Sequence, residues 1–345
     1  MSNSNKNIEK NISQEQISAI FKEFEQKNIL IIGDVMLDDY IIGDVSRISP
    51  EAPVPIVNLR NRYVCLGGAS NVALNIKSLG ATPILLSVIG KDAKSAIFEQ
   101  QMNAKGLTLD GILKSEERIC TTKYRIIGNK MQLLRIDDEM DDNLSPKDVD
   151  NLLSKFTQII DTQQIDAVIF EDYDKGVITK QIIHSIVTLC KDKKIPVLTD
   201  PKKNNFTHYQ DITIFKPNLK ELTQGLGLSD MDYKSEPFLT AIERFMEEKG
   251  HQMILLTLSA DGMIVYQKKN TGIEQIHIAA HLRNIADVSG AGDTVISVAA
   301  LGLSIGLPIE KTVAMANLAG GLVCEEIGVV AVDKQKLFQE MWKIQ

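Results

Sequence analysis

Continuous apolar runs alternate with amphipathic, helix-like segments along most of the chain. The run at 28–34 ends in a glycine and an aspartate, a pattern typical of a strand buried on both faces of a parallel sheet. Similar runs predict strands at 83–89, 166–170, 195–199, 212–216 and 252–257. Helical spacing predicts helices at 69–79, 92–105, 145–160, 179–191, 235–249, 290–305 and 308–325. The alternation indicates βαβ units and a mostly parallel sheet.

An amphipathic helix is predicted before the first strand. Ser13 and Gln16 have the spacing of a capping box, and one face of the helix is apolar. We expect residues 1–27 to be a polar tail followed by this helix. Since no linker or repeat divides the rest, residues 28–345 are expected to form one large domain.

Two segments interrupt the alternation, at 36–66 and 117–137, because both are rich in strand-forming residues and lack helices. Pro50, Pro53 and Pro55 cannot serve a central ladder, so the first segment is expected to be an edge strand or exposed flap. The second predicts a hairpin turning at Gly128-Asn129. Together they predict a small β lid.

Composition narrows the class of protein. The 345 residues are 44% hydrophobic and 24% charged, as in an ordinary globular protein. A net charge of −7 argues against broad nucleic-acid binding. The four cysteines are widely spaced, no signal peptide is visible, and the longest apolar run is too short for a membrane span. We expect a cytoplasmic protein that binds neither nucleic acid nor membrane.

The segment "DVSGAGDTV" (287–295) predicts an anion site at a helix start. Gly290 and Gly292 allow the backbone to approach a ligand, and the helix presents free N–H groups. Asp293 would repel a bound phosphate unless it accepts a proton from the group attacking that phosphate. On local sequence alone, Asp293 could instead only favour the helix dipole.

Two further segments carry candidate chemistry. Asn218 and Glu221 in "FKPNLKEL" (215–222) are three residues apart and suit Mg²⁺ held largely through water, although an ordinary capping box explains the same pattern. Gly67 and Gly68 open a helix in "CLGGASNV" (65–72). No dinucleotide fingerprint, Walker A lysine motif or protein-kinase HRD loop occurs, so ATP would be bound by another route.

In order and spacing, these motifs resemble those of the ribokinase-like (PfkB) carbohydrate kinases, over about residues 28–330. The motifs are "GDVMLD" (33–38), "GGASN" (67–71), "NLKE" (218–221) and "DVSGAGD" (287–293). Within this family, the segments "SRISPEAPVP" (46–55) and "DYDKGVIT" (172–179) resemble the corresponding segments of heptose-7-phosphate kinases. The resemblance implies a three-layer α/β/α sandwich with a small β-sheet lid, and a kinase that uses ATP and Mg²⁺.

The resemblance also implies roles for individual residues. Asp293 matches the catalytic base, and the amides of Gly290, Ala291 and Gly292 match the anion hole. Asn218 and Glu221 match the Mg²⁺-organising pair. The expected sugar contacts are Asp38, Gly67, Gly68 and Asn71. The nucleotide is expected near Lys202, Thr257, Ser259 and Gly262.

The expected sugar phosphate requires cations, and the candidates are Arg47, Lys123, Arg125, Arg135 and Lys175. Each of these taken singly could be a surface charge. Alternation along the hairpin places Lys123 and Arg125 on one face.

The expected reaction transfers the γ-phosphate of ATP to the C1 hydroxyl of D-glycero-β-D-manno-heptose 7-phosphate, for ADP-heptose and lipopolysaccharide core synthesis. A different sugar or sugar phosphate, of the fructose phosphate or ribose type, is the alternative. A silent ligand-binding protein would be expected to lose Asp293, Asn218 or Glu221, and none is lost. We expect a homodimer through the lid edges. A separate adenylyltransferase and phosphatase are expected, because no adenylyltransferase start follows the kinase motifs.

Overall fold

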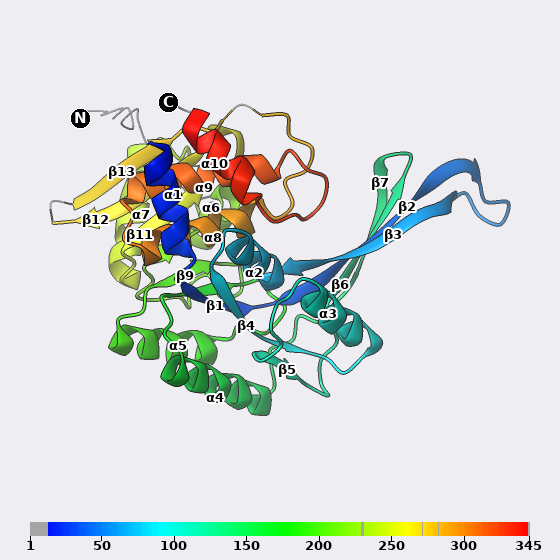
Figure 1. The fold of residues 1–345 in the computed structure, drawn as a ribbon, viewed down its shortest axis with the longest axis horizontal. Helices are drawn as coiled ribbons and strands as arrows, with labels where there is room; N and C mark the ends of the chain where they lie inside the picture. The colour runs from blue at the N-terminus through cyan, green and yellow to red at the C-terminus, as the bar shows by residue number, and fades with distance from the viewer. Residues whose placement is uncertain (1–12, 229–230, 271, 282, 344–345) are drawn as a thin grey trace.

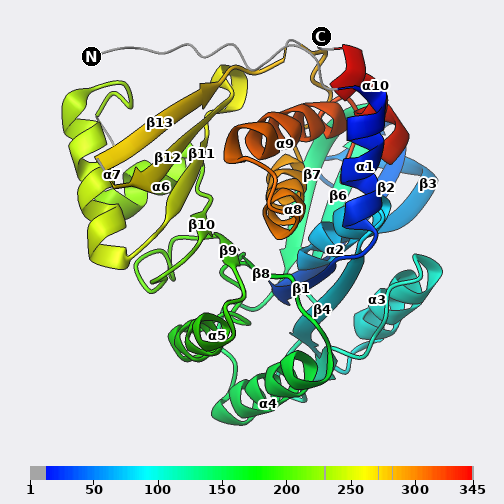
Figure 2. The ribbon, with the colours of Figure 1, turned by 60° about the vertical axis from the view of Figure 1, so that its left-hand side comes forward.

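A computed structural model describes residues 13–228, 231–270, 272–281 and 283–343. The expected polar tail at 1–12 lies outside the described residues. Within them, nine strands form one mixed, largely parallel sheet with helices on both faces (Figures 1 and 2). In spatial order these strands are β13 (Gly272–Ile278), β12 (Met263–Lys269), β11 (Met253–Thr257), β10 (Ile214–Phe215), β9 (Val197–Asp200), β8 (Ala167–Glu171), β1 (Asn28–Gly33), β4 (Thr82–Ile89) and β5 (Ile112–Lys114). Among the described strands of this sheet, only the pairs β11–β12 and β12–β13 are antiparallel.

The helices confirm the predicted alternation with strands. They are α1 (Gln14–Phe24), α2 (Ala69–Ser78), α3 (Ala93–Ala104), α4 (Pro146–Thr162), α5 (Lys180–Lys193), α6 (Leu219–Leu226), α7 (Glu236–Lys249), α8 (Ala291–Ser304), α9 (Ile309–Val323) and α10 (Lys334–Lys343). The strands predicted from apolar runs include none at β5, β12 or β13. Strand β10 is shorter than the expected run at 212–216. No helix among the described residues has the length and apolar character needed to cross a bilayer.

Two hydrophobic cores lie on opposite faces of the large sheet. In β1, Ile29 and Ile31 belong to the core shared with α1, α2, α8 and α9. Leu30 and Ile32 belong to the core shared with α4, α5 and α7. Because successive side chains of a strand point to opposite faces, a continuous apolar run is required to fill both cores. The three-layer α/β/α sandwich is therefore confirmed.

The lid is a four-stranded sheet among the described residues, with the order β3-β2-β6-β7, and it projects from the body (Figure 1). Its strands are β2 (Val35–Ile48), β3 (Pro55–Gly68), β6 (Thr122–Gly128) and β7 (Met131–Asp138). Strand β3 lies at one edge and starts at Pro55, as the prolines predict. The hairpin turns at Asn129 and Lys130, both with positive φ (52° and 67°), one residue later than expected.

Candidate active site

Asp293 lies in the first turn of α8 and is buried. Its Oδ2 accepts a hydrogen bond from Asn71 Nδ2 of α2 at 2.7 Å, and its Oδ1 accepts one from the Tyr173 hydroxyl at 2.8 Å. Burial raises the pKa of Asp293, and these two hydrogen bonds partly oppose that effect. Asp293 is thus a fixed, oriented carboxylate with a raised pKa, which suits a proton acceptor.

The backbone before Asp293 has room for a ligand because it lacks side chains. Gly290 has a φ of +80°, and a Cβ there would lie 2.7 Å from Asn71 Nδ2. The amide of Ala291 donates to the Val288 carbonyl at 3.3 Å, so the anion hole expected from three amides is incomplete at this position. Within the described chain, no acceptor is found for the amide of Gly292, which leaves this N–H free for an anion.

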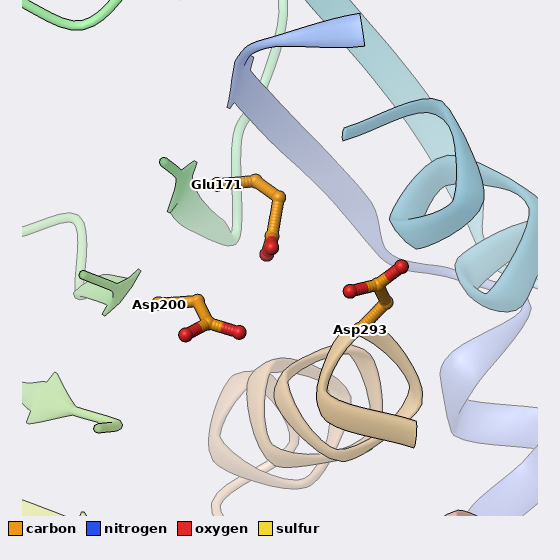
Figure 3. Close-up of side chains that lie close together, drawn as sticks. All are labelled: Glu171, Asp200 and Asp293. Carbon is orange, nitrogen blue, oxygen red and sulfur yellow. The ribbon is translucent and has the colours of Figure 1, made fainter. Parts of the chain in front are cut away.

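Three carboxylates from separate elements converge beside this helix start (Figure 3). They belong to Glu171, Asp200 and Asp293, and one oxygen of each lies within 4.8 Å of the others. Glu171 ends β8 and Asp200 ends β9, where the two are register partners. Burial, and then the charges of Asp200 and Asp293, raise the pKa of Glu171 well above its ordinary range.

Two lysines balance part of this negative charge. The Lys216 ammonium lies 2.7 Å from Asp200 Oδ2 and is itself buried. Lys202 lies 2.6 Å from Glu221 Oε1 and 3.6 Å from Asp200 Oδ1. Although burial raises the pKa of Asp200, the charges of Lys202 and Lys216 outweigh it and the net pKa is lowered.

Tyr173, Glu171, Asp200 and Lys216 were not singled out from the sequence as site residues. A usable signal was present, because Glu171, Asp200 and Lys216 end or directly follow neighbouring parallel strands. The carboxyl ends of such strands meet at one edge of the sheet, where α/β proteins bind ligands.

The inner face of the lid carries the expected sugar-binding group Asp38. This carboxylate is buried and forms an ion pair with Arg125 of β6. The cross-strand register pairs Asp38 with Lys123 and Tyr40 with Arg125, so Lys123 and Arg125 share a face as alternation predicts. A Cβ on Gly67 would lie 2.3 Å from Asp38 Oδ2, which explains a glycine here.

Glu139 holds two of the expected cations together. It accepts hydrogen bonds from Lys123 at 3.0 Å and from Lys175 at 2.7 Å. The amide of Lys175 also donates to the buried carboxylate of Asp34 at 3.1 Å, which anchors the loop after β8. The structure therefore brings Lys123 and Lys175 together.

Two other expected cations lie elsewhere. Arg47 is exposed near the far end of β2, nine residues beyond Asp38. At about 3.3 Å per residue this is roughly 30 Å. Arg135 is exposed and pairs with Asp137 at 2.9 Å. Within one copy of the chain, β2 carries Arg47 away from Asp38, and the expectation that Arg47 contacts the sugar stays a prediction.

Asn218 and Glu221 form the capping box that was the alternative explanation. Asn218 Oδ1 accepts from the Glu221 amide, and Glu221 Oε2 accepts from the Asn218 amide, both at 2.8 Å. Thr257 forms an isolated bridge with Asn218. Ser259 and Gly262 follow in the short turn after β11, both with positive φ. The expected nucleotide residues thus lie along one continuous edge, from Lys202 through Glu221 to this turn.

A buried carboxylate at a glycine-rich helix start, with a second buried carboxylate on a lid beside it, is an arrangement typical of small-molecule phosphotransferases built on an α/β sandwich. The sequence model of the family described as "pfkB family carbohydrate kinase" matches residues 26–336 of this chain. The chain belongs to this family, whose members are kinases that use ATP.

Curated relatives agree with this membership. "Bifunctional protein HldE" of Desulfatibacillum aliphaticivorans is 37% identical over 91% of this chain and 63% of its own length. The protein of the same name from Rhodospirillum rubrum is 36% identical over 92% of this chain and 62% of its own length. The chain therefore spans less than two thirds of these relatives.

Solved structures show the same fold. Arabidopsis thaliana ribokinase complexed with ribose and ATP superimposes with a TM-score of 0.68 at 16% identity, covering 92% of this chain and 99% of the other. Escherichia coli phosphofructokinase-2 in complex with fructose-6-phosphate gives a TM-score of 0.71 at 15% identity, covering 91% and 98%. At such identities the similarity concerns the fold alone.

Proposed function

We propose that this protein transfers the γ-phosphoryl group of ATP to the C1 hydroxyl of D-glycero-β-D-manno-heptose 7-phosphate, giving the 1,7-bisphosphate and ADP. The observation that carries the kinase chemistry is the buried Asp293 carboxylate, held by Asn71 and Tyr173 beside the free amide of Gly292. The heptose assignment is supported by the segment at 46–55 and by the HldE relatives, which match over about nine tenths of this chain.

In this reaction Asp293 takes the proton of the sugar hydroxyl. The hydroxyl oxygen of the sugar forms the new bond to the γ-phosphorus. The bond between the γ-phosphorus and the bridging oxygen breaks, and ADP leaves. The Gly292 amide and the positive end of α8 stabilise the charge on the transferring group. Mg²⁺ supplies further charge neutralisation when it is bound with the nucleotide. The carboxylates near Gly292, and the side-chain oxygens of Asn218 and Glu221, are suited to hold that ion.

In this proposal the lid and the loop after β8 bind the substrate. Asp38 suits sugar hydroxyls, because a carboxylate accepts from paired O–H donors. Lys123 and Lys175 suit the 7-phosphate, since both ammonium groups converge on Glu139 and can exchange this partner for a phosphate. Closure of the lid would exclude water and so limit hydrolysis of ATP.

A homodimer through the lid forms part of this proposal. Strand β7 lies at the lid edge and exposes Leu134 (54%) and Ile136 (49%), which favours burial against a second copy. Light scattering is expected to show a dimer that Leu134→Asp dissociates. Ile97→Asp on α3, also an exposed apolar position, should not dissociate it, and a monomeric wild-type protein would contradict the dimer.

The function is tested by measuring ADP release with ATP, Mg²⁺ and each of three acceptors: the heptose 7-phosphate, fructose 6-phosphate and ribose. Only the heptose phosphate is expected to support rapid turnover, and phosphorus NMR should locate the new phosphate on C1. A preference for fructose 6-phosphate or ribose would refute the heptose assignment and would leave the assignment as a sugar kinase in place.

A further inference from the structure

Glu139 lies directly after β7, in the connection to α4, and joins two lysines that come from separate parts of the fold. Its Oε2 accepts a hydrogen bond from Lys123 of β6 at 3.0 Å, and its Oε1 accepts one from Lys175, in the loop after β8, at 2.7 Å. Although burial raises the pKa of Glu139, the hydrogen bonds from the two lysines outweigh it, and the net pKa is lowered. Glu139 is therefore an ionised carboxylate held between two ammonium groups.

The two lysines lie on the side of the site where the substrate is expected. Lys123 is the register partner of Asp38, the proposed sugar contact, across the strands β6 and β2. Lys175 comes two residues after Tyr173, whose hydroxyl donates to Asp293 at 2.8 Å. Both ammonium groups are largely shielded from solvent, because the side chains of Lys123 and Lys175 are only 14% and 17% exposed. The lysine pair thus connects the sugar-facing lid with the loop that holds the base.

The charges around Glu139 match those of a phosphate only when Glu139 itself is displaced. Lys123 and Arg135 also contact Asp137, at 3.6 Å and 2.9 Å. Three positive charges, on Lys123, Lys175 and Arg135, against two negative ones, on Asp137 and Glu139, leave a net charge of +1 in this cluster. Without Glu139 the net charge is +2, which balances a phosphate monoester of about −2 near neutral pH. Carboxylate and phosphate oxygens both accept hydrogen bonds from ammonium groups, so one can replace the other.

We infer that Glu139 is an internal competitor for the phosphate of the substrate, and that it sets how tightly the site holds a phosphorylated sugar. The inference rests on the proposed function, because it assigns the sugar's phosphate to Lys123 and Lys175. Glu139 keeps the two ammonium groups together until a phosphate displaces it, and its return favours release of the bisphosphate product. Glu139 can move without breaking the lid sheet, since the β6–β7 pairing ends at Asp138.

The test measures binding of inorganic phosphate to the nucleotide-free protein by isothermal titration calorimetry. Glu139→Gln keeps the size of the side chain and removes its charge, so the dissociation constant of phosphate should fall about tenfold. Asp138→Asn is the matched control, because it removes the same charge one residue away, where Asp138 contacts Lys94 at 2.5 Å. Its phosphate affinity should stay within about twofold of wild type. Adding Lys175→Met to Glu139→Gln should abolish the gain, which assigns the phosphate to the lysine pair.

A second measurement uses the kinase reaction. The KM for heptose 7-phosphate should fall about tenfold in Glu139→Gln, because the sugar's phosphate no longer competes with a carboxylate, whereas the KM for ATP should not change. An unchanged KM for the heptose in an active enzyme retains the proposed function and overturns the inference.

Two results of the calorimetry would also overturn the inference. One is unchanged or weaker phosphate binding by folded Glu139→Gln, which would make Glu139 a structural bridge between the lid and the body. The other is an equal gain in Asp138→Asn, which would reduce the effect to overall charge. Circular dichroism checks folding, and Glu139→Ala replaces the first variant if Glu139→Gln does not fold. Tighter phosphate binding by a protein that phosphorylates no heptose refutes the proposed function and retains Glu139 as the competitor.

Discussion

Tyr173 is expected to act as a positioning residue that keeps Asp293 ionised. Its hydroxyl donates to Asp293 Oδ1 at 2.8 Å. Burial, and then the charge of Asp293, raise the pKa of Tyr173 well above its ordinary range, so the phenol remains a donor at every pH of interest. Tyr173→Phe removes this donor and leaves the ring in place.

The size of the effect follows from the hydrogen bond. A bond to a charged group contributes about 1.5–3 kcal/mol, and 1.4 kcal/mol corresponds to a factor of ten. The bond favours the carboxylate, so its loss raises the pKa of Asp293 further and moves the acid limb of the profile of kcat/KM to higher pH. On that limb Tyr173→Phe should be about 10- to 100-fold slower than wild type. At high pH, where Asp293 is ionised in both proteins, the rates should converge.

The assay is ADP release across a pH series with the preferred sugar. Tyr209→Phe is the matched control, because its buried hydroxyl donates to Asp172 at 2.9 Å and does not contact Asp293. It should leave the acid limb in place. If Tyr173→Phe lowers kcat/KM equally at every pH, or leaves the profile unchanged, Tyr173 does not act through the ionisation of Asp293.

Three further predictions concern the base and the lid. Asp293→Asn should lower kcat by about 10²- to 10⁴-fold while calorimetry shows nucleotide affinity nearly unchanged, and near-normal turnover would exclude Asp293 as the base. Gly67→Ala should raise the sugar KM about tenfold, because the new Cβ would lie 2.3 Å from Asp38 Oδ2; an unchanged KM would separate Gly67 from the sugar site. Arg125→Met should lower the free energy of unfolding in urea by about 3 kcal/mol, since Asp38 loses its ion-pair partner. Burial raises the pKa of Asp38, so this loss should shrink as the pH falls and Asp38 protonates; a loss independent of pH would argue against the ion pair as its cause.

Elements with a regular pattern could be predicted from the sequence. The apolar run of β1 and the helical spacing of α8 are local properties, and they were found within a residue or two. The strands β5 and β13 were not predicted. Strand β5 has only three residues and β13 has mixed polarity, so neither carries a clear periodic signal. The segment 287–295 similarly indicated a base at a helix start, since its glycines and aspartate are contiguous.

The sequence by itself thus determined the layered α/β fold, the lid and the candidate base, because each depends on neighbours within one or two turns of chain. Only the tertiary structure decided which side chains meet. Asn71 and Asp293 are 222 positions apart, and Glu171 meets Asp200 only through the register of β8 and β9. Strand order and register arise from packing of the whole sheet, so no local pattern specifies them. The same packing carries Arg47 away from Asp38 and brings three acids together beside the helix start.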